Sequence, residues 1–203
     1  MPKKNKAWVH QHINDSYVHL AQREGYRSRA AYKLLEIDEE HHILKNTKVV
    51  VDLGCAPGSW SQLLVRKLGS NCHIIGVDLL EMEPLHGMDF ILGDFTEEEV
   101  LQSLLDKISG NQVDVVLSDM SPNLSGISGV DQARSAYLIE LALDFAANHL
   151  KVGGHCVTKI FHGSEFDNLV KAARKLFNQV VIYKPKASRA KSSETYLVCK
   201  SKL

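Results

Sequence analysis

The sequence predicts an α/β fold, with a mostly parallel sheet of seven strands, helices on both faces and an antiparallel hairpin at one edge. Three observations lead to this prediction. Short apolar runs alternate with amphipathic stretches along the chain. The last two apolar runs have no helix between them, as expected for an antiparallel pair. The 203 residues, 44% of them hydrophobic, suffice for one domain with a substantial core.

The strands are expected where apolar residues run together and end at glycines or acids. They fall at 48–54, 73–79, 88–94, 113–120, 155–161, 180–183 and 195–199. The intervening stretches have helical spacing, at 60–68, from 96 onward with three acids in its first turn, at 131–150 and at 164–177. The pair Gly153-Gly154 is expected to end the long third helix.

The N-terminal 40 residues are interpreted as a basic appendage docked on a domain formed by residues 41–203. Residues 28–38 have the pattern of a helix that can pack apolar side chains. Seven Lys or Arg and two acids occur in residues 1–33, and six against one in residues 184–203. The remainder carries 11 basic against 21 acidic residues, so two basic ends flank an acidic body although the formal net charge is zero. If these ends meet on one face, they form a positive patch suited to a phosphate backbone.

Several classes of protein are excluded or disfavoured. No apolar run approaches the roughly 18 residues that span a bilayer, and the basic first residues precede no apolar stretch, so we expect a soluble cytoplasmic protein, with monomer as the default. The four cysteines are scattered, without the close spacing of a zinc site, and we expect no metal.

The loop after the first strand, Asp52 to Trp60, is the first candidate for a ligand site, because open parallel sheets bind ligands beyond the carboxyl ends of their strands. Gly54 and Gly58 allow a tight turn and a close approach to a ligand. The second predicted strand ends near Asp78, which can accept hydrogen bonds from both ribose hydroxyls of an adenosine, and the third ends at Asp94, which can bind the adenine amino group.

A dinucleotide and S-adenosylmethionine are both compatible with this geometry. The loop lacks the third glycine of a dinucleotide fingerprint and has Pro57 instead. The carboxylates of Asp52 and Asp119 would repel a pyrophosphate but suit a sulfonium and an amino group. The residues therefore favour S-adenosylmethionine.

Five stretches of the chain resemble the FtsJ-type ribose 2′-O-methyltransferases, and closely those that act on bacterial large-subunit ribosomal RNA. They are YRSRAAYKLLEID (26–38), VDLGCAPGSWSQ (51–62), SDMSPN (118–123), KIF (159–161) and RAKSSETY (189–196). The resemblance implies a Rossmann-like methyltransferase fold and a catalytic tetrad of Lys33, Asp119, Lys159 and Glu194. It also implies cofactor contacts at Gly58, Trp60, Asp78, Asp94 and Asp119.

Methyl transfer to a ribose hydroxyl requires the oxygen to be held in line with the methyl group and its proton to be removed. Lys159 interrupts an apolar strand end and is the better placed base, since a second nearby lysine and partial burial favour a neutral amine. Lys33 would add positive charge and touch RNA, Asp119 would orient Lys159, and Glu194 would bind a lysine or the ribose. Which group takes the proton stays open at this point.

The resemblance implies methylation of a uridine ribose in 23S ribosomal RNA, within the 50S subunit or a late precursor. A 2′-O-methyltransferase of transfer RNA or of an mRNA cap, and a non-catalytic ribosome-assembly factor, stay as alternatives. Phosphate contacts are expected from the basic ends, namely Lys3, Lys4, Lys6, Arg23, Arg27, Arg29, Lys184, Lys186, Arg189 and Lys191. Trp8, Tyr17 and Tyr26 could stack on a base or equally belong to the core.

Overall fold

The computed structural model describes residues 15–110 and 112–203. Its strands are β1 (Val49–Leu53), β2 (His73–Asp78), β3 (Asp89–Leu92), β4 (Val113–Ser118), β5 (Leu150–Phe161), β6 (Phe177–Tyr183) and β7 (Glu194–Lys202). Its helices are α2 (Ser16–Glu24), α3 (Ala31–His41), α4 (Ser59–Leu68), α5 (Glu98–Ile108), α6 (Ser128–His149) and α7 (Phe166–Leu176), with a short 3₁₀ turn, η1 (Gly69–Asn71). None of these helices is long and apolar enough to cross a membrane.

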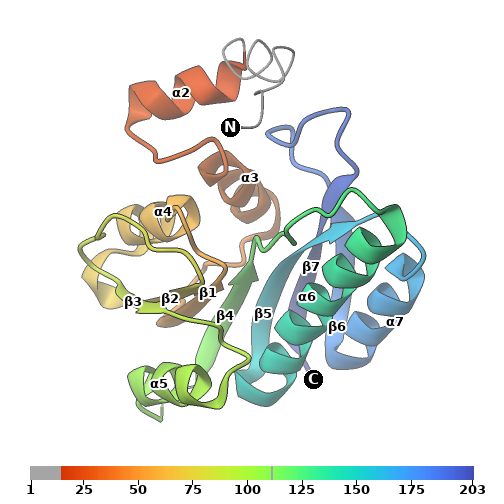
Figure 1. Cartoon of the computed structure of the whole chain (residues 1–203). Coiled ribbons are helices and arrows are strands. Elements are labelled where there is room, and N and C mark those ends of the chain that lie inside the picture. Colours follow the sequence, from red (N-terminus) through yellow and green to blue (C-terminus); the bar gives the residue numbers. More distant parts are fainter. Residues whose placement is uncertain (1–14, 111) are drawn as a thin grey trace.

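The seven strands form one sheet in the order β3-β2-β1-β4-β5-β7-β6. The first five in this order are parallel, whereas β7 runs antiparallel to both β5 and β6. The predicted fold class is therefore confirmed. The carboxyl ends of the parallel strands point toward α3 and the loop of residues 184–193, which places any ligand site at this end of the sheet (Figure 1).

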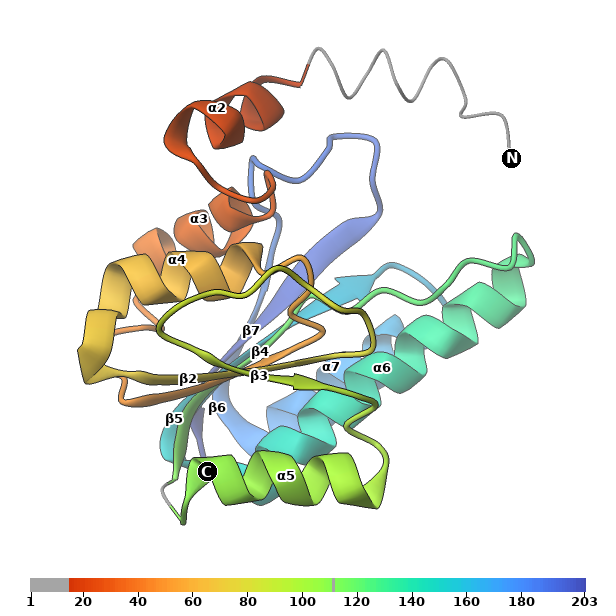
Figure 2. The ribbon, with the colours of Figure 1, turned by 60° about the vertical axis from the view of Figure 1, so that its left-hand side comes forward.

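Helices cover both faces of the sheet, and each layer buries its own apolar cluster. Side chains of α3 and α4, including Leu34, Ile37 and Leu64, pack with one face of the sheet and are fully buried. Side chains of α5, α6 and α7, including Leu104 and Ala142, form the core on the other face. The amino end of α6 and the loop before it project beyond the sheet (Figure 2).

The described part of the N-terminal segment lies against the loop of residues 184–193. Glu36 on α3 accepts hydrogen bonds from the backbone N–H groups of Lys186 (2.5 Å) and Ala187 (3.0 Å). Arg29 forms an ion pair with Asp15 and donates to the carbonyl of Ala187. The two basic segments thus meet on one face, although the division of the chain at residue 40 stays a prediction.

Several predicted boundaries were wrong. The strand expected to begin at 155 begins at Leu150, directly after α6, and contains the glycine pair that was expected to end the helix. Gly153 has a φ of +80°, and the register between β4 and β5 shifts here, as in a β-bulge. A Cβ on Gly154 would lie 2.9 Å from the carbonyl oxygen of Asp114, so glycine permits close strand approach. Helix α2 was not predicted.

Candidate active site

Lys159 and Asp119 form a close pair where β5 and β4 run side by side. Lys159 belongs to β5, and Asp119 directly follows β4. The Lys159 Nζ lies 2.8 Å from Asp119 Oδ1 and donates hydrogen bonds to the backbone oxygen of Asp119 (2.8 Å) and to Ser121 Oγ (2.9 Å). The side chain of Lys159 is buried, 6% exposed. Because a buried ammonium needs partners, these three contacts explain why a lysine is tolerated within this apolar strand.

Lys33 and Glu194 complete the predicted set. Lys33 on α3 places its Nζ 2.8 Å from Glu194 Oε1, and the other Glu194 oxygen lies 3.8 Å from Lys159 Nζ. Ser188 also donates a hydrogen bond of 2.8 Å to Glu194 Oε1. The four residues singled out from the sequence therefore form one continuous network, although they come from four separate parts of the chain.

Tyr196 also contacts this network. Its hydroxyl donates a 2.7 Å hydrogen bond to Asp119 Oδ1, and its ring is fully buried with Lys33 Nζ 5.8 Å from the ring centroid. Burial alone would raise the pKa of Asp119, but the charges of Lys159 and Lys33 hold it below its ordinary value. Burial and the neighbouring Asp119 raise the pKa of Tyr196 well above its ordinary value. Asp119 is therefore an anion and Tyr196 a neutral hydrogen-bond donor.

A cleft of about 430 Å³ opens beside the tetrad at the ends of β1, β2 and β3. It is lined by several of the predicted cofactor residues, Gly54, Asp78, Asp94 and Asp119. The carboxylate of Asp78 accepts hydrogen bonds from the backbone N–H groups of Ala56 and Leu80, both 2.8 Å long. These bonds fix the orientation of Asp78 and tie the ends of β1 and β2 together.

The backbone of the loop after β1 requires its glycines. Gly54 has a φ of +73°, and Gly58 has a φ of +94° at the start of α4. A Cβ on Gly58 would lie 2.6 Å from Nη1 of Arg27. That guanidinium donates to the carbonyl oxygens of Pro57 and Pro84, each at 2.9 Å, and so ties the loop to the segment that follows β2.

Asp52 is a buried acid in a small recess that joins the loop to Asp119. Its Oδ2 accepts a 2.7 Å hydrogen bond from Ser61, whereas its buried Oδ1 has no hydrogen-bond partner. Burial raises the pKa of Asp52 to about 7, even though the bond from Ser61 works in the opposite direction. A positively charged or donating group in the recess would satisfy Oδ1 and favour the ionised form.

Trp60 has a packing role in the structure. Its indole N–H donates to the carbonyl of Ala30 (2.8 Å), its ring lies 5.7 Å from that of Tyr196, and it is 3% exposed. It lines the small recess beside Asp52 rather than the large cleft. A cofactor contact from Trp60 stays a prediction.

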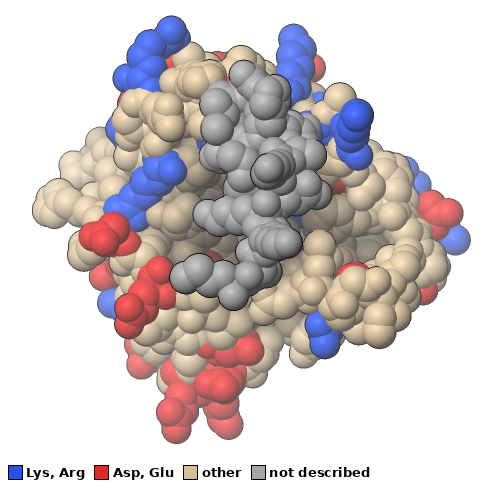
Figure 3. All heavy atoms as spheres, turned by 45° about the horizontal axis from the view of Figure 1, so that its top comes forward, with Lys and Arg blue, Asp and Glu red and all other residues tan. Residues whose placement is uncertain are grey.

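The face around the site carries positive side chains. Figure 3 shows Lys and Arg mainly in the upper half of the face, on its left and right sides, and Asp and Glu mainly toward its lower edge. Four of the predicted phosphate contacts are exposed, namely Arg23, Lys184, Lys186 and Lys191. Arg29 is instead paired with Asp15, and Arg27 holds the loop after β1. Lys3, Lys4, Lys6 and Trp8 lie outside the described residues.

Two predicted base-stacking aromatics take part in packing. The rings of Tyr17 and Tyr26 both lie 5.5 Å from the ring of Tyr32. Tyr17 also donates to Glu36 (2.9 Å), and the Arg66 guanidinium lies 4.4 Å from the Tyr26 ring centroid. Among the described residues, no group of three or more His, Cys, Asp or Glu is arranged to hold a metal ion.

Sequence reasoning missed the roles of Ser121, Tyr196 and Arg27. A signal existed for Tyr196, because side chains two apart in a strand share a face and Tyr196 is two residues from Glu194. Ser121 follows Asp119 by two residues, but it lies in a loop, where no regular alternation of side chains predicts the direction of its hydroxyl. The bridge made by Arg27 joins segments distant in sequence and left no local pattern.

The fold and the site together define a Rossmann-like methyltransferase. The FtsJ-like methyltransferase family model matches residues 26–202, and the chain belongs to this family. It is 55% identical to a ribosomal RNA large subunit methyltransferase E from Methylobacillus flagellatus, over 96% of this chain and 94% of that protein. It is 51% identical to the protein of the same name from Chromobacterium violaceum, over 98% of both. A solved structure from Plasmodium falciparum, described as a ribosomal RNA methyltransferase, superimposes with a TM-score of 0.76 at 33% identity, covering 88% of this chain and 99% of that one.

Proposed function

We propose that this protein transfers a methyl group from S-adenosylmethionine to the ribose 2′-hydroxyl of a uridine in 23S ribosomal RNA. The substrate in this proposal is the 50S subunit or a late precursor, and the enzyme is a cytoplasmic monomer. The observation that carries the proposal is the closed Lys33–Glu194 and Lys159–Asp119 network beside an acid-lined cleft. The names of the relatives, which span almost the whole chain, support large-subunit ribosomal RNA as substrate.

The residues of the cleft and of the small recess beside Asp119 fit S-adenosylmethionine. The unpartnered Oδ1 of Asp52 is a buried acceptor that suits the amino group of the methionine portion. Asp78 and Asp94 stand at the ends of successive strands, where they suit the ribose and the adenine, and Gly54 and Gly58 let the backbone come close. Asp119 suits a positively charged sulfonium. When bound, the cofactor supplies an electrophilic methyl group.

In this proposal the tetrad removes the proton of the reacting hydroxyl and holds that hydroxyl in place. Asp119 binds Lys159 through both a side-chain and a backbone oxygen, which fixes the position of the amine. The third contact of the amine is with the neutral hydroxyl of Ser121, and in this proposal the ribose hydroxyl takes its place. In this proposal Lys159 Nζ, after losing a proton to solvent, would accept the proton of the 2′-hydroxyl as that oxygen bonds to the methyl carbon and the bond from this carbon to the cofactor sulfur breaks. Lys33, held by Glu194, offers its positive charge to the ribose and the adjacent phosphate.

The charged face supports a nucleic-acid substrate. Arg23 of α2 and Lys184, Lys186 and Lys191 of the loop between β6 and β7 are exposed, and their side chains suit phosphates of an RNA bound at this end of the sheet. Phosphate contacts of this kind position the RNA without reading its sequence. The choice of nucleotide must then come from groups closer to the tetrad.

The test is the transfer of radiolabelled methyl from S-adenosylmethionine to 50S subunits, free 23S RNA and transfer RNA, all prepared from a strain that lacks this protein. We expect label in 50S subunits or 23S RNA, recovered as a 2′-O-methylnucleoside after digestion. Label confined to transfer RNA would show that the substrate is transfer RNA and not ribosomal RNA. An absence of label in every RNA, with cofactor binding shown by calorimetry, would favour a non-catalytic assembly factor.

A further inference from the structure

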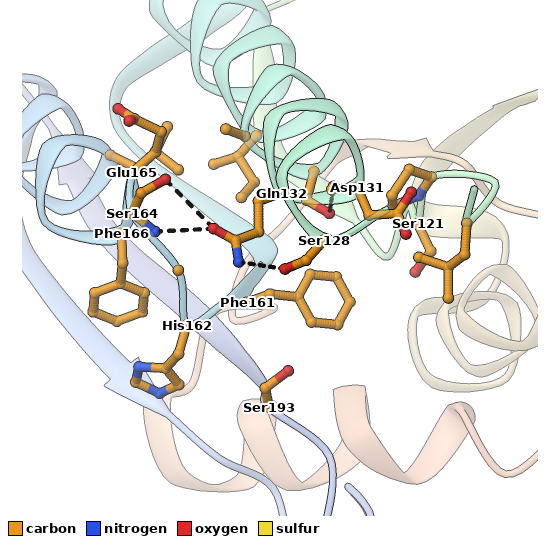
Figure 4. Close-up of a pocket in the computed structure, with 17 residues that line it drawn as sticks. Ser121, Ser128, Asp131, Gln132, Phe161, His162, Ser164, Glu165, Phe166 and Ser193 are labelled. Carbon is orange, nitrogen blue, oxygen red and sulfur yellow. Dashed lines mark hydrogen bonds between the residues drawn. The ribbon is translucent and has the colours of Figure 1, made fainter. Parts of the chain in front are cut away.

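A second cavity, of about 420 Å³, lies beside the tetrad between the amino ends of α6 and α7 (Figure 4). The reaction described above does not use it. Its floor is apolar, formed by Ala136 and Ile139 of α6 and Leu169 of α7, none more than 7% exposed. A cavity of this size with an apolar floor has the properties of a small-ligand pocket.

Flat aromatic groups form one side of this cavity. The ring of His162 stacks on Phe166, with centroids 4.4 Å apart and planes at 16°, and Phe161 adds a third ring nearby. Figure 4 shows these three side chains and Ser193 around the same opening. Stacked and planar side chains of this kind favour a flat ligand, because flat π faces pack well against one another.

A fixed carboxamide faces the aromatic side. Gln132 donates to Ser128 Oγ (3.1 Å), and its Oε1 accepts from the backbone N–H of Ser164 (3.4 Å), as the dashed lines in Figure 4 show. These bonds hold the amide in one orientation. An amide offers both N–H and C=O groups, which match the hydrogen-bonding edge of a nucleobase.

The charges at the cavity argue against a phosphate as its occupant. Among the described residues that line it, none is Lys or Arg, and two are acidic, Asp131 and Glu165. The Asp131 carboxylate is already occupied by Ser125, with hydrogen bonds of 2.7 and 2.8 Å. An anion would meet negative charge without a compensating Lys or Arg side chain, so the cavity suits a neutral planar group.

The cavity adjoins the tetrad through two serines. Ser121 lines it and also accepts the hydrogen bond from Lys159 Nζ, and Ser193 lines it directly before Glu194 in the chain. Ser121 also lines the cofactor cleft, so the reacting centre lies between the two spaces. A ribose held at Lys159 would therefore have the cofactor cleft on one side and this cavity on the other.

We propose that this cavity holds the nucleobase of the nucleotide whose ribose is methylated. This inference rests on the proposed function. An unstacked base seated between Phe166, His162 and Gln132 would fix the rotation of its ribose and present the 2′-hydroxyl to Lys159. The cavity would then select the nucleotide, while the exposed Lys and Arg side chains of the surrounding face bind phosphates.

The first test is kinetic and uses 50S subunits from the strain that lacks the protein. In Phe166→Ala and His162→Ala, we expect KM for the subunits to rise about tenfold or more, the effect of losing one base-stacking contact, with kcat for bound RNA changed far less. His162 is exposed, so its variant keeps the test valid if Phe166→Ala does not fold. Gln102→Ala, on the surface of α5, is the control and keeps the wild-type KM. An unchanged KM in both cavity variants would overturn the proposal.

The second test identifies the occupant. His162 is replaced by the photoreactive p-benzoylphenylalanine, the variant is irradiated with the same subunits, and the crosslink is mapped by reverse transcription. We expect the crosslink at the nucleotide that the wild-type enzyme methylates, mapped independently. A crosslink to another nucleotide or to a ribosomal protein, or no RNA crosslink, would overturn the inference. Failure of the wild-type enzyme to methylate these subunits would instead overturn the proposed function.

Discussion

Asp52 gives a prediction whose sign and size follow from its burial. Its pKa of about 7 in the fold, against an ordinary value of 3.8, means that the folded protein binds a proton more tightly than the unfolded chain. For an acid with a raised pKa, folding stability is greatest at low pH and is lost as pH rises from the unfolded to the folded pKa. The full loss is about 4 kcal/mol, of which about 3 kcal/mol falls between pH 5 and pH 8.

The perturbation is Asp52→Asn, which keeps the shape and an acceptor for Ser61 but removes the titration. The assay is the free energy of unfolding in urea, measured for the cofactor-free protein at pH 5 and pH 8. We expect the wild type to lose about 3 kcal/mol more than the variant over this interval. The histidines whose pKa is lowered by burial, His41, His149 and His155, titrate in both proteins and cancel in the difference.

Asp114→Asn is a matched control with the opposite sign. The pKa of Asp114 is lowered, because its bonds to Lys151 and to the backbone of Lys48 and Val49 outweigh its burial. Its contribution to stability is therefore complete above the unfolded pKa, near 4, and is lost only in acid, so this variant should keep the wild-type change between pH 5 and pH 8. An equal change in wild type and Asp52→Asn would refute the reasoning about Asp52.

Three further predictions follow from the site. Lys159→Ala should lower kcat about 100- to 10,000-fold with cofactor affinity retained, because a general base is removed. Lys151→Ala, at the other end of β5, is the control and should keep the wild-type kcat. Equal kcat values in the two variants would remove Lys159 from the base role. Tyr196→Phe removes a hydrogen bond to a charged acceptor and should lower the free energy of unfolding by about 2 kcal/mol in urea denaturation; an unchanged midpoint would contradict this. Gly54→Ala forces a side chain onto a backbone with φ +73° and against the side chain of Met120, and should lower the free energy of unfolding by about 1–3 kcal/mol. A wild-type melting temperature would show that the loop adapts freely.

The sheet was predictable because its strands carry strong local patterns. The run Val49–Leu53 is buried at every position, and the absence of a helix between the last two strands indicated the antiparallel pair correctly. The start of β5 was not predictable from the same rules. The local sequence at Gly153 and Gly154 predicts the end of a helix. In the fold both glycines lie inside a bulged strand, where they allow β5 to approach β4 closely.

The grouping of Lys33, Asp119, Lys159 and Glu194 was predictable because the motifs that resemble a known family carry all four residues. Its supporting contacts were not, since they depend on tertiary placement. Arg27 was expected to bind RNA, yet its guanidinium bridges Pro57 and Pro84. Likewise Gln132 and His162 face one cavity only because α6 and the β5–α7 loop come together in the fold, and no motif marks either residue.

The most direct test of the central claim is mass-spectrometric nucleoside analysis of 23S ribosomal RNA from three cell lines. One lacks this protein, one is complemented with the wild type, and one is complemented with Lys159→Ala at matched protein levels. We predict 2′-O-methyluridine that is reduced in the deletion, restored by the wild type and not restored by the variant. An unchanged content of every 2′-O-methylnucleoside across the three lines would contradict the account.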